Sequence, residues 1–541
     1  MKSPLKVLLL AGCIGSISGC SYFSPQQAAR DAVKTQTKKA KSQLDKLRTA
    51  TLSGTDLSGT DDAGRPLWKV SAKSIHAMGN TQDVESGAMP ANAQLTEAHA
   101  VLYKEGKVES QFDSPQMQLL YQEDGSVRLV LSGGVKAIAQ GSWTKQRGAV
   151  QITTPQATVN IKKRQLWTNH GVNIAQGQGS ERVVVTSKTL LANTDLKTAD
   201  LGGGVKSTTS RGVMTANGAN WNWATGQLTA EGKVTANGND INIDGQHLKA
   251  DTNAHLVTVW GNVTAKSDKG TATASKVLYR WDSGKLTATG GVRLQGNGTT
   301  VNASQIDTTK AMKDATASGG VQVRRGDLTV LASSATVTKM GDNAFAVTGN
   351  GSVKVQNPQG WAKANHATWK NNQITANGNV TLSHDGYSIS GDNLNTDDKF
   401  KQATLTGDVH GAMPGGGSMN AGKAVYSNGK VIATGGVSGR KGDLRLKASR
   451  LESSADGKNV ELTGNVTVRN SDGTTISAPQ ARYDRDKNEV YAWGGVTLRD
   501  PAHNLTQHGK TLTADLNLKK AVLTDVSGSG KMNVLQGKKL F

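Results

Sequence analysis

Cysteine is almost absent from this chain of 541 residues. Its only two cysteines, Cys13 and Cys20, lie within the first twenty residues. The rest of the chain therefore holds neither a disulfide framework nor a cysteine metal site. Aromatic residues are also scarce, at 4% of the sequence. Any interior must consequently be lined by valine, alanine, leucine and isoleucine, which is typical of a thin, sheet-like core.

Catalytic motifs are absent as well. The ten histidines include no HExxH sequence and no close pair at the spacing of metal ligands. Glycine-rich phrases such as GQGQG and GGGSM lack the Lys-Ser/Thr that completes a phosphate-binding loop. We therefore predict that the chain is not an enzyme and that it holds no cofactor and no metal.

Long hydrophobic runs are missing too, and the apolar run near the N-terminus is too short to span a bilayer. Residues 1–19 have the order of an export signal: lysines, a short apolar run, then small residues before a cysteine. The phrase ISGC ending at Cys20 resembles the lipobox of bacterial lipoproteins, whose cysteine becomes the lipidated first residue. LAGC ending at Cys13 fits better but would leave a signal of only twelve residues. Cys20 is thus the preferred lipidation site, and Cys13 is the alternative.

Residues 20–64 are interpreted as a lipid anchor, a short basic helix and a linker. Ser24 and Pro25 are suited to begin a helix, and the glycine-free run up to residue 48 contains good helix formers with several lysines. Residues 51–64, TLSGTDLSGTDDAG, have the composition of a flexible linker.

Basic residues outnumber acidic ones by 63 to 42, which gives a net charge of +21. The basic residues are scattered rather than clustered. Such a field favours anionic partners, namely phosphorylated lipid, acidic glycan or nucleic acid. Lysines on exposed strands would equally keep a long sheet soluble. Scattered charge on an exported chain argues against nucleic-acid binding.

One phrase, apolar-x-small-x-Gly-x-Val, recurs along most of the chain. It occurs as LTATGGV ending at Val292 and as ATASGGV ending at Val321, 29 residues later. Glycine lies two residues before the valine in twelve of thirteen copies, and the exception has His170 there. A period of this length indicates an array of supersecondary units that bury their apolar faces against their neighbours. The thirteen repeat valines are Val135, Val172, Val205, Val234, Val263, Val292, Val321, Val353, Val380, Val409, Val437, Val466 and Val496.

Each repeat is predicted to contain about three short strands. In the copy at Val292, Val292 and Leu294 alternate before a turn at residues 296–298, and Val301, Ala303 and Ile306 make a second strand. Alternation with period two indicates strands with one buried face.

Glycine has two predicted roles in these repeats. The glycine two residues before the valine permits a bulge, a sharp bend or a close backbone approach, so Gly290 and Gly319 are predicted bends or contact points. Asn-Gly and Asp-Gly pairs, including those that begin at residues 244, 297, 350, 377 and 428, are predicted tight turns.

The segments GRPLWKVSAKS, LTEAHAVLYKEGKVESQF and LVLSGGV resemble LptC, and the units from Val135 onward resemble the OstA repeats of LptA and of the periplasmic part of LptD. The resemblance covers about residues 57–535. It divides the strand-rich part into an LptC-like segment, residues 65–150, and an OstA-like array, residues 151–541. It implies an all-β fold, an elongated repeat β-jellyroll whose two facing antiparallel sheets leave an open groove.

The same resemblance implies a bridge for lipopolysaccharide transport in the periplasm of a diderm bacterium, with acyl chains held in the groove. The implied partners are lipopolysaccharide or a related glycolipid, a membrane reached through the N-terminal lipid, and other transport components. The sequence leaves open whether the inner or the outer membrane holds the anchor. The predicted groove-lining residues are Val135, Val234, Val263, Val292, Leu294, Ile306, Val321, Val380, Val409, Val437, Val466 and Val496.

A second reading remains open, in which the array is a closed β-solenoid with a dry interior and a structural or adhesive role in the envelope. Period and alternation are common to both readings. Among the ten tryptophans, those such as Trp221, Trp223, Trp260, Trp281 and Trp493 are predicted either to lie at the groove lips or to pack within the strands.

Overall fold

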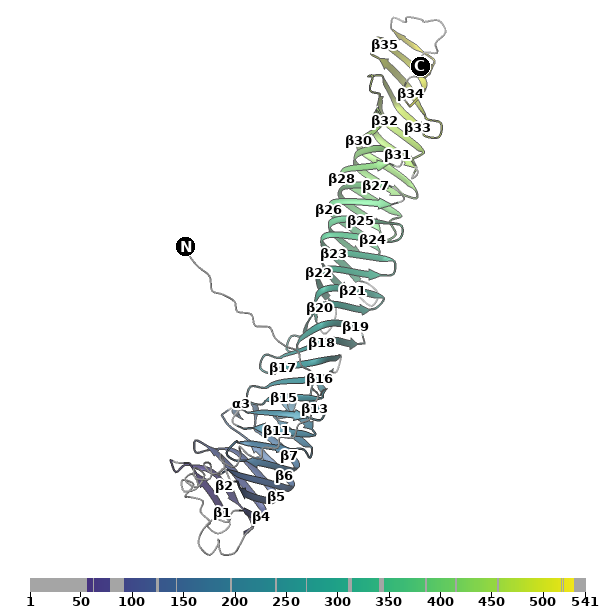
Figure 1. The fold of residues 1–541 in the computed structure, drawn as a ribbon. Coiled ribbons are helices and arrows are strands. Elements are labelled where there is room, and N and C mark those ends of the chain that lie inside the picture. The colour runs from purple at the N-terminus through teal and green to yellow at the C-terminus, as the bar shows by residue number, and fades with distance from the viewer. Residues whose placement is uncertain are drawn as a thin grey trace, which may run out of the picture. The chain divides into compact units, whose positions relative to one another are not determined.

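The computed structural model describes residues 56–529, except residues 62, 78–91, 123–125, 143, 195–196, 239–240, 269, 310–313, 340–344, 385–386, 414–415, 455–456, 517 and 519. The predicted signal peptide, Cys13, Cys20 and the basic helix lie outside the described residues. The described chain is almost entirely β (Figure 1). Within it, no helix has the length and apolar character needed to cross a membrane.

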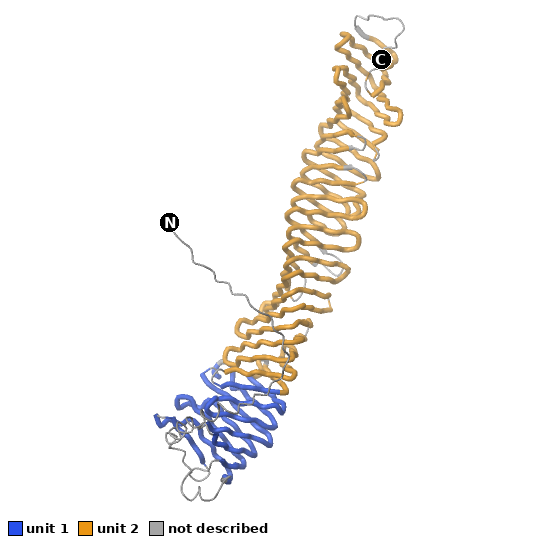
Figure 2. The backbone as a smooth tube through the Cα atoms, in the orientation of Figure 1, with its two compact units in different colours: residues 1–176, 189–196 blue, residues 177–188, 197–541 orange. Residues whose placement is uncertain are grey.

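The chain divides into two compact units (Figure 2). Unit 1 comprises residues 1–176 and 189–196, and unit 2 comprises residues 177–188 and 197–541. This division is separate from the predicted domain boundary at residue 150, which stays a prediction.

Unit 1 is built from antiparallel strands. Neighbours in sequence pair from β4 to β8, while β2 and β3 both pair with β4, and β9 pairs with β7. A single helical turn, α3 (Thr144–Arg147), follows β6. The strands are β1 (Asp56–Thr60), β2 (Pro66–Ser71), β3 (Ser74–Ala77), β4 (Asn92–Lys104), β5 (Lys107–Tyr121), β6 (Val127–Ala139), β7 (Val150–Asn160), β8 (Gln165–Thr168), β9 (Val172–Gln176) and β11 (Thr189–Asn193).

The linker prediction is wrong for part of its range. Residues 56–60 form β1, which pairs with β2 and buries Leu57 at 1% exposure. The buried positions alternate here as Leu57 and Gly59, and a single leucine among small polar residues gives too weak a period-two signal to be recognised in the sequence. The sheet therefore begins earlier in the chain than composition indicates.

Unit 2 begins with a 3-10 turn, η1 (Gly179–Glu181), and continues as antiparallel strands. From β16 to β35 each strand pairs with the next one in sequence, so the chain runs as successive hairpins (Figure 1). The strands before β16 are short: β10 (Val183–Ser187), β12 (Thr198–Gly202), β13 (Val205–Thr209), β14 (Gly212–Ala216) and β15 (Gly218–Asn222). The strands that follow are β16 (Gln227–Gly238), β17 (Asn242–Asp251), β18 (Leu256–Ser267), β19 (Gly270–Arg280), β20 (Lys285–Gly296), β21 (Thr299–Thr309), β22 (Asp314–Arg325), β23 (Leu328–Lys339), β24 (Phe345–Gln356), β25 (Gly360–Lys370), β26 (Gln373–His384), β27 (Tyr387–Asp397), β28 (Gln402–Met413), β29 (Gly417–Ser427), β30 (Lys430–Lys441), β31 (Leu444–Ser454), β32 (Asn459–Arg469), β33 (Thr475–Asp484), β34 (Glu489–Asp500), β35 (Leu505–Asp515), β36 (Ala521–Thr524) and β37 (Ser527–Ser529).

The prediction of three short strands per repeat is wrong. One 29-residue period contains two long strands, for example β20 and β21. The phrase around Val292 lies in the middle of β20 rather than at a strand end, and Ala315 and Ala317 belong to the next long strand, β22. The glycine pair interrupts the alternation without ending the strand, because a bulge shifts the register by one residue and pairing then resumes.

The glycine two residues before the valine is a bend, as predicted for Gly290 and Gly319. In β20, Thr289 pairs with Gln305 and Val292 pairs with Ala303, so Gly290 and Gly291 together stand opposite one residue of β21. Two residues opposite one is the definition of a β-bulge. The same register shift occurs in each of the even-numbered strands from β16 to β34.

The position between that glycine and the valine is also restricted. Gly290 and Gly291 have φ of 82° and 69°, and the equivalent position holds Asn262 at 51° and Asn379 at 52°. Such left-handed backbone favours glycine and, among other residues, asparagine and aspartate. The repeat therefore requires two consecutive residues with positive φ. The residue between the glycine and the valine, written as x in the phrase, is thus restricted in its backbone conformation.

Each bulge divides its strand into two halves, which we call the A limb and the B limb. In β20 the A limb is residues 285–289 and the B limb is residues 292–296, and each limb pairs with the matching limb of β19 and β21. Side chains alternate between buried and exposed on both limbs. Residues of both limbs line one pocket, and a B-limb tip is hydrogen-bonded to an A-limb tip, so the buried faces of the two limbs face each other. This is the β-jellyroll arrangement predicted from the resemblance.

The antiparallel pairing contradicts the closed-solenoid reading of the fold. In a solenoid, successive coils run in the same direction, whereas each described strand pair is antiparallel. The predicted tight turns at residues 297 and 428 are confirmed. The pairs at residues 244, 350 and 377 lie instead inside strands, where the pairs at 350 and 377 help to form bulges.

Candidate functional site

In unit 2 the repeat valines from Val234 onward lie in a row on the inner face of the B limb. Val135 in unit 1 and the predicted lining valines of unit 2 are each at most 2% exposed. Ile306 is 2% exposed as well and lies on the A limb of β21, whereas Leu294 is only partly buried. The predicted residues therefore share one interior within unit 2 and are contributed by both limbs. Whether they contact lipid stays a prediction.

Small residues face the repeat valines across the strand pairs. Val292 pairs with Ala303, and Val321 pairs with Ala332. Glycine takes the same place opposite Val380, where it is Gly391. Each of these branched side chains therefore stands opposite a methyl group or a hydrogen.

Serines reinforce the bends from the neighbouring strand. Ser275 Oγ donates a hydrogen bond to the carbonyl oxygen of Gly290 at 2.7 Å, and Ser304 Oγ does the same for Gly319 at 2.7 Å. A β-carbon added to Gly290 would lie 2.6 Å from the β-carbon of Ser275. Glycine is thus required here for space as well as for its backbone conformation.

The two limbs also meet at their tips, at the opposite end of each strand from the bulge, and we call this side of unit 2 the mouth. Asn357, at a B-limb tip, donates from Nδ2 to the carbonyl oxygen of Asp398, at an A-limb tip, at 2.9 Å. His384 lies edge-on to Tyr426 with 5.0 Å between ring centroids. Each contact joins chain segments that are about three strands apart, which periodicity along the sequence does not reveal.

Unit 1 has a comparable contact between its limbs. Arg164, between β7 and β8, forms an ion pair with Glu109 near the start of β5, and the side chains are 16% and 11% exposed. Arg164 also donates to the carbonyl oxygen of Tyr103 at 2.9 Å. The hydroxyl of Thr194 lies 3.5 Å from the same Glu109 carboxylate. This ion pair therefore joins two strand ends of unit 1 that are 55 residues apart in sequence.

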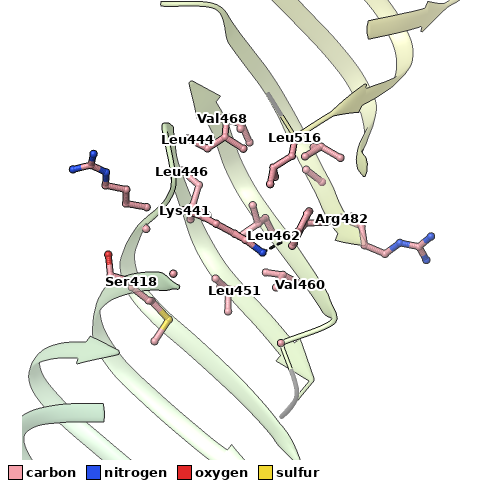
Figure 3. A pocket seen from close by; sticks show the side chains of 18 residues that line it. Ser418, Lys441, Leu444, Leu446, Leu451, Val460, Leu462, Val468, Arg482 and Leu516 are labelled. Atoms are coloured by element: carbon pink, nitrogen blue, oxygen red, sulfur yellow. Dashed lines mark hydrogen bonds between the residues drawn. The ribbon is translucent and has the colours of Figure 1, made fainter. Parts of the chain in front are cut away.

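An apolar pocket lies between the limbs near the C-terminal end of unit 2 (Figure 3). The pocket is partly open to solvent. Its B-limb wall includes Leu444, Leu446 and Val468, and its A-limb wall includes Val460 and Leu462. Sequence reasoning missed this pocket, because its walls come from several strands whose proximity depends on how the limbs fold over one another.

Lys441 enters this pocket from the B limb. Its Nζ donates a hydrogen bond to the hydroxyl oxygen of Tyr483, on the A limb of β33, at 2.7 Å. The same ammonium lies 4.4 Å from the centroid of the Tyr483 ring, which adds a cation–π contact. In Figure 3 the Lys441 side chain extends across the space between the limbs, while that of Arg482 points away from it.

The tryptophans divide between the two predicted roles. Trp221 and Trp223 are buried at 4% and 1% exposure and belong to the core. Trp260 stacks on His247 with 37% of its surface exposed, and Trp493 stacks on Tyr491. Trp281 alone of these five takes part in a described contact across the mouth, where the guanidinium of Arg211 lies 5.9 Å from its ring centroid.

Two adjacent carboxylates in the turn between β27 and β28 are expected to have opposite effects on stability. Burial, followed by repulsion from Asp397, raises the pKa of Asp398 above its ordinary 3.8. Asp397 instead accepts hydrogen bonds from the backbone N–H groups of Lys399, Lys401 and Gln402. We expect Asp398→Asn to stabilise the turn slightly at neutral pH and Asp397→Asn to destabilise it by about 1 kcal/mol.

The pH dependence follows from the direction of the Asp398 shift. A raised folded-state pKa means that ionisation opposes folding, so the cost is present at neutral pH and disappears as pH falls below the ordinary value. The benefit of Asp398→Asn should therefore vanish in acid. Hydrogen exchange of the β27–β28 hairpin at several pH values measures this, and an equal benefit at all pH values would contradict it.

Metal chemistry has no support in the described part of the chain, where no group of three or more His, Cys, Asp or Glu side chains is arranged to hold an ion. The buried polar and apolar side chains instead form walls and contacts between limbs.

Comparison with known families agrees with the motifs. The family model described as lipopolysaccharide-assembly, LptC-related, matches residues 7–210 and 431–529, which together exceed half of the chain. The model described as LptA/(LptD N-terminal domain) LPS transport protein matches residues 300–402. No curated protein matches the chain. The resemblance to the lipopolysaccharide-transport proteins is thus confirmed, and the chain belongs to the LptC-related lipopolysaccharide-assembly family.

Proposed function

We propose that this protein is a periplasmic bridge or chaperone for lipopolysaccharide transport between the inner and outer membranes, with acyl chains held between the A and B limbs. The observation that carries the proposal is the row of equivalent valines, which repeats every two strands on the inner face of the B limb. Membership of a lipopolysaccharide-assembly family supplies the class of cargo.

An array of equivalent positions suits movement of a lipid along it. Each buried methylene contributes roughly 0.8 kcal/mol, so several acyl chains would be held firmly. Because successive repeats offer nearly the same surface, a chain that shifts by one repeat exchanges one set of contacts for another like it. Binding is then strong while the barrier between neighbouring positions stays low.

Loading requires the limbs to separate, since the valines are almost fully buried. The contacts at the mouth of unit 2 are suited to this. They consist of single hydrogen bonds and ring contacts, such as those of Asn357 and His384, each worth on the order of 1 kcal/mol. The limbs would part at the mouth, and the bulges would act as the hinge.

Anchoring is part of the proposal. Lipidation at Cys20, or alternatively at Cys13, would hold the N-terminus at the inner or the outer membrane. The array would then extend into the periplasm toward other transport components. The function needs no catalytic group, because the proposed activity is transfer of an unchanged lipid.

The test is site-specific photocrosslinking in cells that make lipopolysaccharide. Crosslinkers at Val292 and Val380 should capture lipopolysaccharide, because both side chains face the interior. A crosslinker at Arg293, the exposed neighbour of Val292, is the matched control and should capture little. Crosslinks from Arg293 alone would refute the proposal. Saturable binding of fluorescent lipid A to the purified chain tests it without a bulky substitution, and no saturable binding would equally refute it.

A further inference from the structure

The pocket near the C-terminal end of unit 2 has the features of a binding site for one anionic lipid chain, an inference that rests on the proposed function. Eighteen residues line it, and most of the wall is leucine, valine and glycine. Three lining residues, Arg440, Lys441 and Arg482, carry positive charge, and none is aspartate or glutamate. Apolar walls with cationic groups alone at the rim match a molecule with a hydrocarbon chain and an anionic end.

Lys441 distinguishes this pocket from the other contacts across the mouth. Arg440 and Arg482 are exposed, and Figure 3 shows the Arg482 side chain directed away, whereas Lys441 is partly buried and crosses the pocket. Among the described residues its ammonium forms no ion pair, and its contacts are the hydroxyl and the ring of Tyr483. Charged groups in apolar surroundings are normally paired with an opposite charge. The geometry therefore points to an anionic ligand as the counter-ion of the Lys441 ammonium.

We propose that Lys441 is a latch that binds the phosphate of an anionic lipid whose acyl chain occupies this pocket. Its hydrogen bond to Tyr483 ties the B limb to the A limb across the mouth. The ammonium is a charged donor in both cases, but a phosphate is an anionic acceptor whereas the phenol is neutral, so only the phosphate adds the attraction of opposite charges. Phosphate therefore displaces the phenol, the connection between the limbs is released, and entry of the chain is coupled to recognition of its charged end.

The experiment needs a readout at this pocket, because other parts of the array also bind hydrocarbon. The only native cysteines lie within the first twenty residues. In the full chain with Cys13→Ser and Cys20→Ser, a Ser418→Cys substitution places an environment-sensitive dye on the pocket wall. Titration with decyl phosphate and with decyl alcohol compares equal hydrocarbon chains with and without the anionic group.

We expect decyl phosphate to bind at least about tenfold more tightly than decyl alcohol, the size of a hydrogen bond to a charged group. Lys441→Met, which keeps most of the apolar stem, should abolish this preference and change alcohol binding little. Lys447→Met, at an exposed position of β31 outside the pocket, is the matched control and should keep it. Tyr483→Phe should bind decyl phosphate as tightly as the parent or more so, because the competing hydroxyl is gone.

The outcomes separate this inference from the proposed function. If Lys441→Met keeps the phosphate preference, or if Tyr483→Phe loses it as fully as Lys441→Met does, the latch is refuted. If crosslinkers at Val292 still capture lipopolysaccharide in that case, the lipid conduit stands without it. If neither amphiphile binds the parent chain and no crosslink forms, both proposals fail. Unchanged far-UV circular dichroism establishes that the variants are folded.

Discussion

Gly290→Ala should lower the free energy of local opening of the repeat around β20 by about 2–3 kcal/mol, because alanine would be forced into a left-handed conformation. The new methyl group would also lie 2.6 Å from the β-carbon of Ser275, which is part of the neighbouring strand and cannot move away freely. The bulge would have to open, and with it the junction of the A and B limbs. Repeat arrays do not unfold in one step, so the measurement is hydrogen exchange of peptides from β19 to β21, where protection should fall.

Gly291→Asn is the matched control for this substitution. Gly291 also has positive φ, but an added β-carbon meets no atom within 4 Å. Asparagine already occupies the equivalent position at Asn262 and Asn379. We expect the free energy of local opening, measured by hydrogen exchange, to change by less than about 1 kcal/mol in the Gly291→Asn variant. Equal loss of protection in the two variants would show that the Gly290 contact does not limit the bulge.

Glu109→Gln should destabilise unit 1 by about 2–3 kcal/mol, because it removes the negative charge from a largely buried ion pair. The guanidinium of Arg164 would keep its bond to the Tyr103 carbonyl oxygen but lose this carboxylate. Arg164→Met should have an effect of similar size, since it leaves Glu109 with the Thr194 hydroxyl as its described neighbour. Hydrogen exchange of peptides from β4 to β8 measures both variants.

The double variant Glu109→Gln/Arg164→Met supplies the control. If the pair acts as a unit, the double variant should cost less than the sum of the single ones by about 1–3 kcal/mol. Strictly additive effects would mean that the two side chains stabilise unit 1 independently and that their ion pair contributes no coupling energy. The ion pair of Lys73 and Glu97 is an exposed comparison, with side chains 71% and 66% exposed. Breaking it should lower the stability of unit 1 by less than about 1 kcal/mol.

Much of the inner face is predictable because alternation is a local property. Period two alone places Val292 and Ile306 inside, and both are buried. A recurring glycine within an alternating pattern is typical of a bulge or a close backbone approach, which is why Gly290 could be predicted as a bend. The strand count was wrong for the same local reason: a bulge interrupts alternation just as a strand end does.

The mouth contacts were not predictable from the sequence. Lys441 and Tyr483 are 42 residues apart, and no repeat of the phrase relates them. Nothing distinguishes Lys441 locally from the many exposed lysines of the array. Trp281 was predicted only as one of several possible lip residues, and its contact with Arg211 depends on the position of two tips far apart in sequence.

The sequence by itself determined the repeat, the buried rows and the positions of the bends, since each depends on alternation or on a backbone conformation that glycine and asparagine favour. The tertiary structure decided how many strands a repeat contains, which tips meet across the mouth, and where an apolar pocket receives a lysine. Those features depend on how the A limb lies over the B limb. That placement is set by the sum of many small contacts along both limbs, and no single residue encodes it.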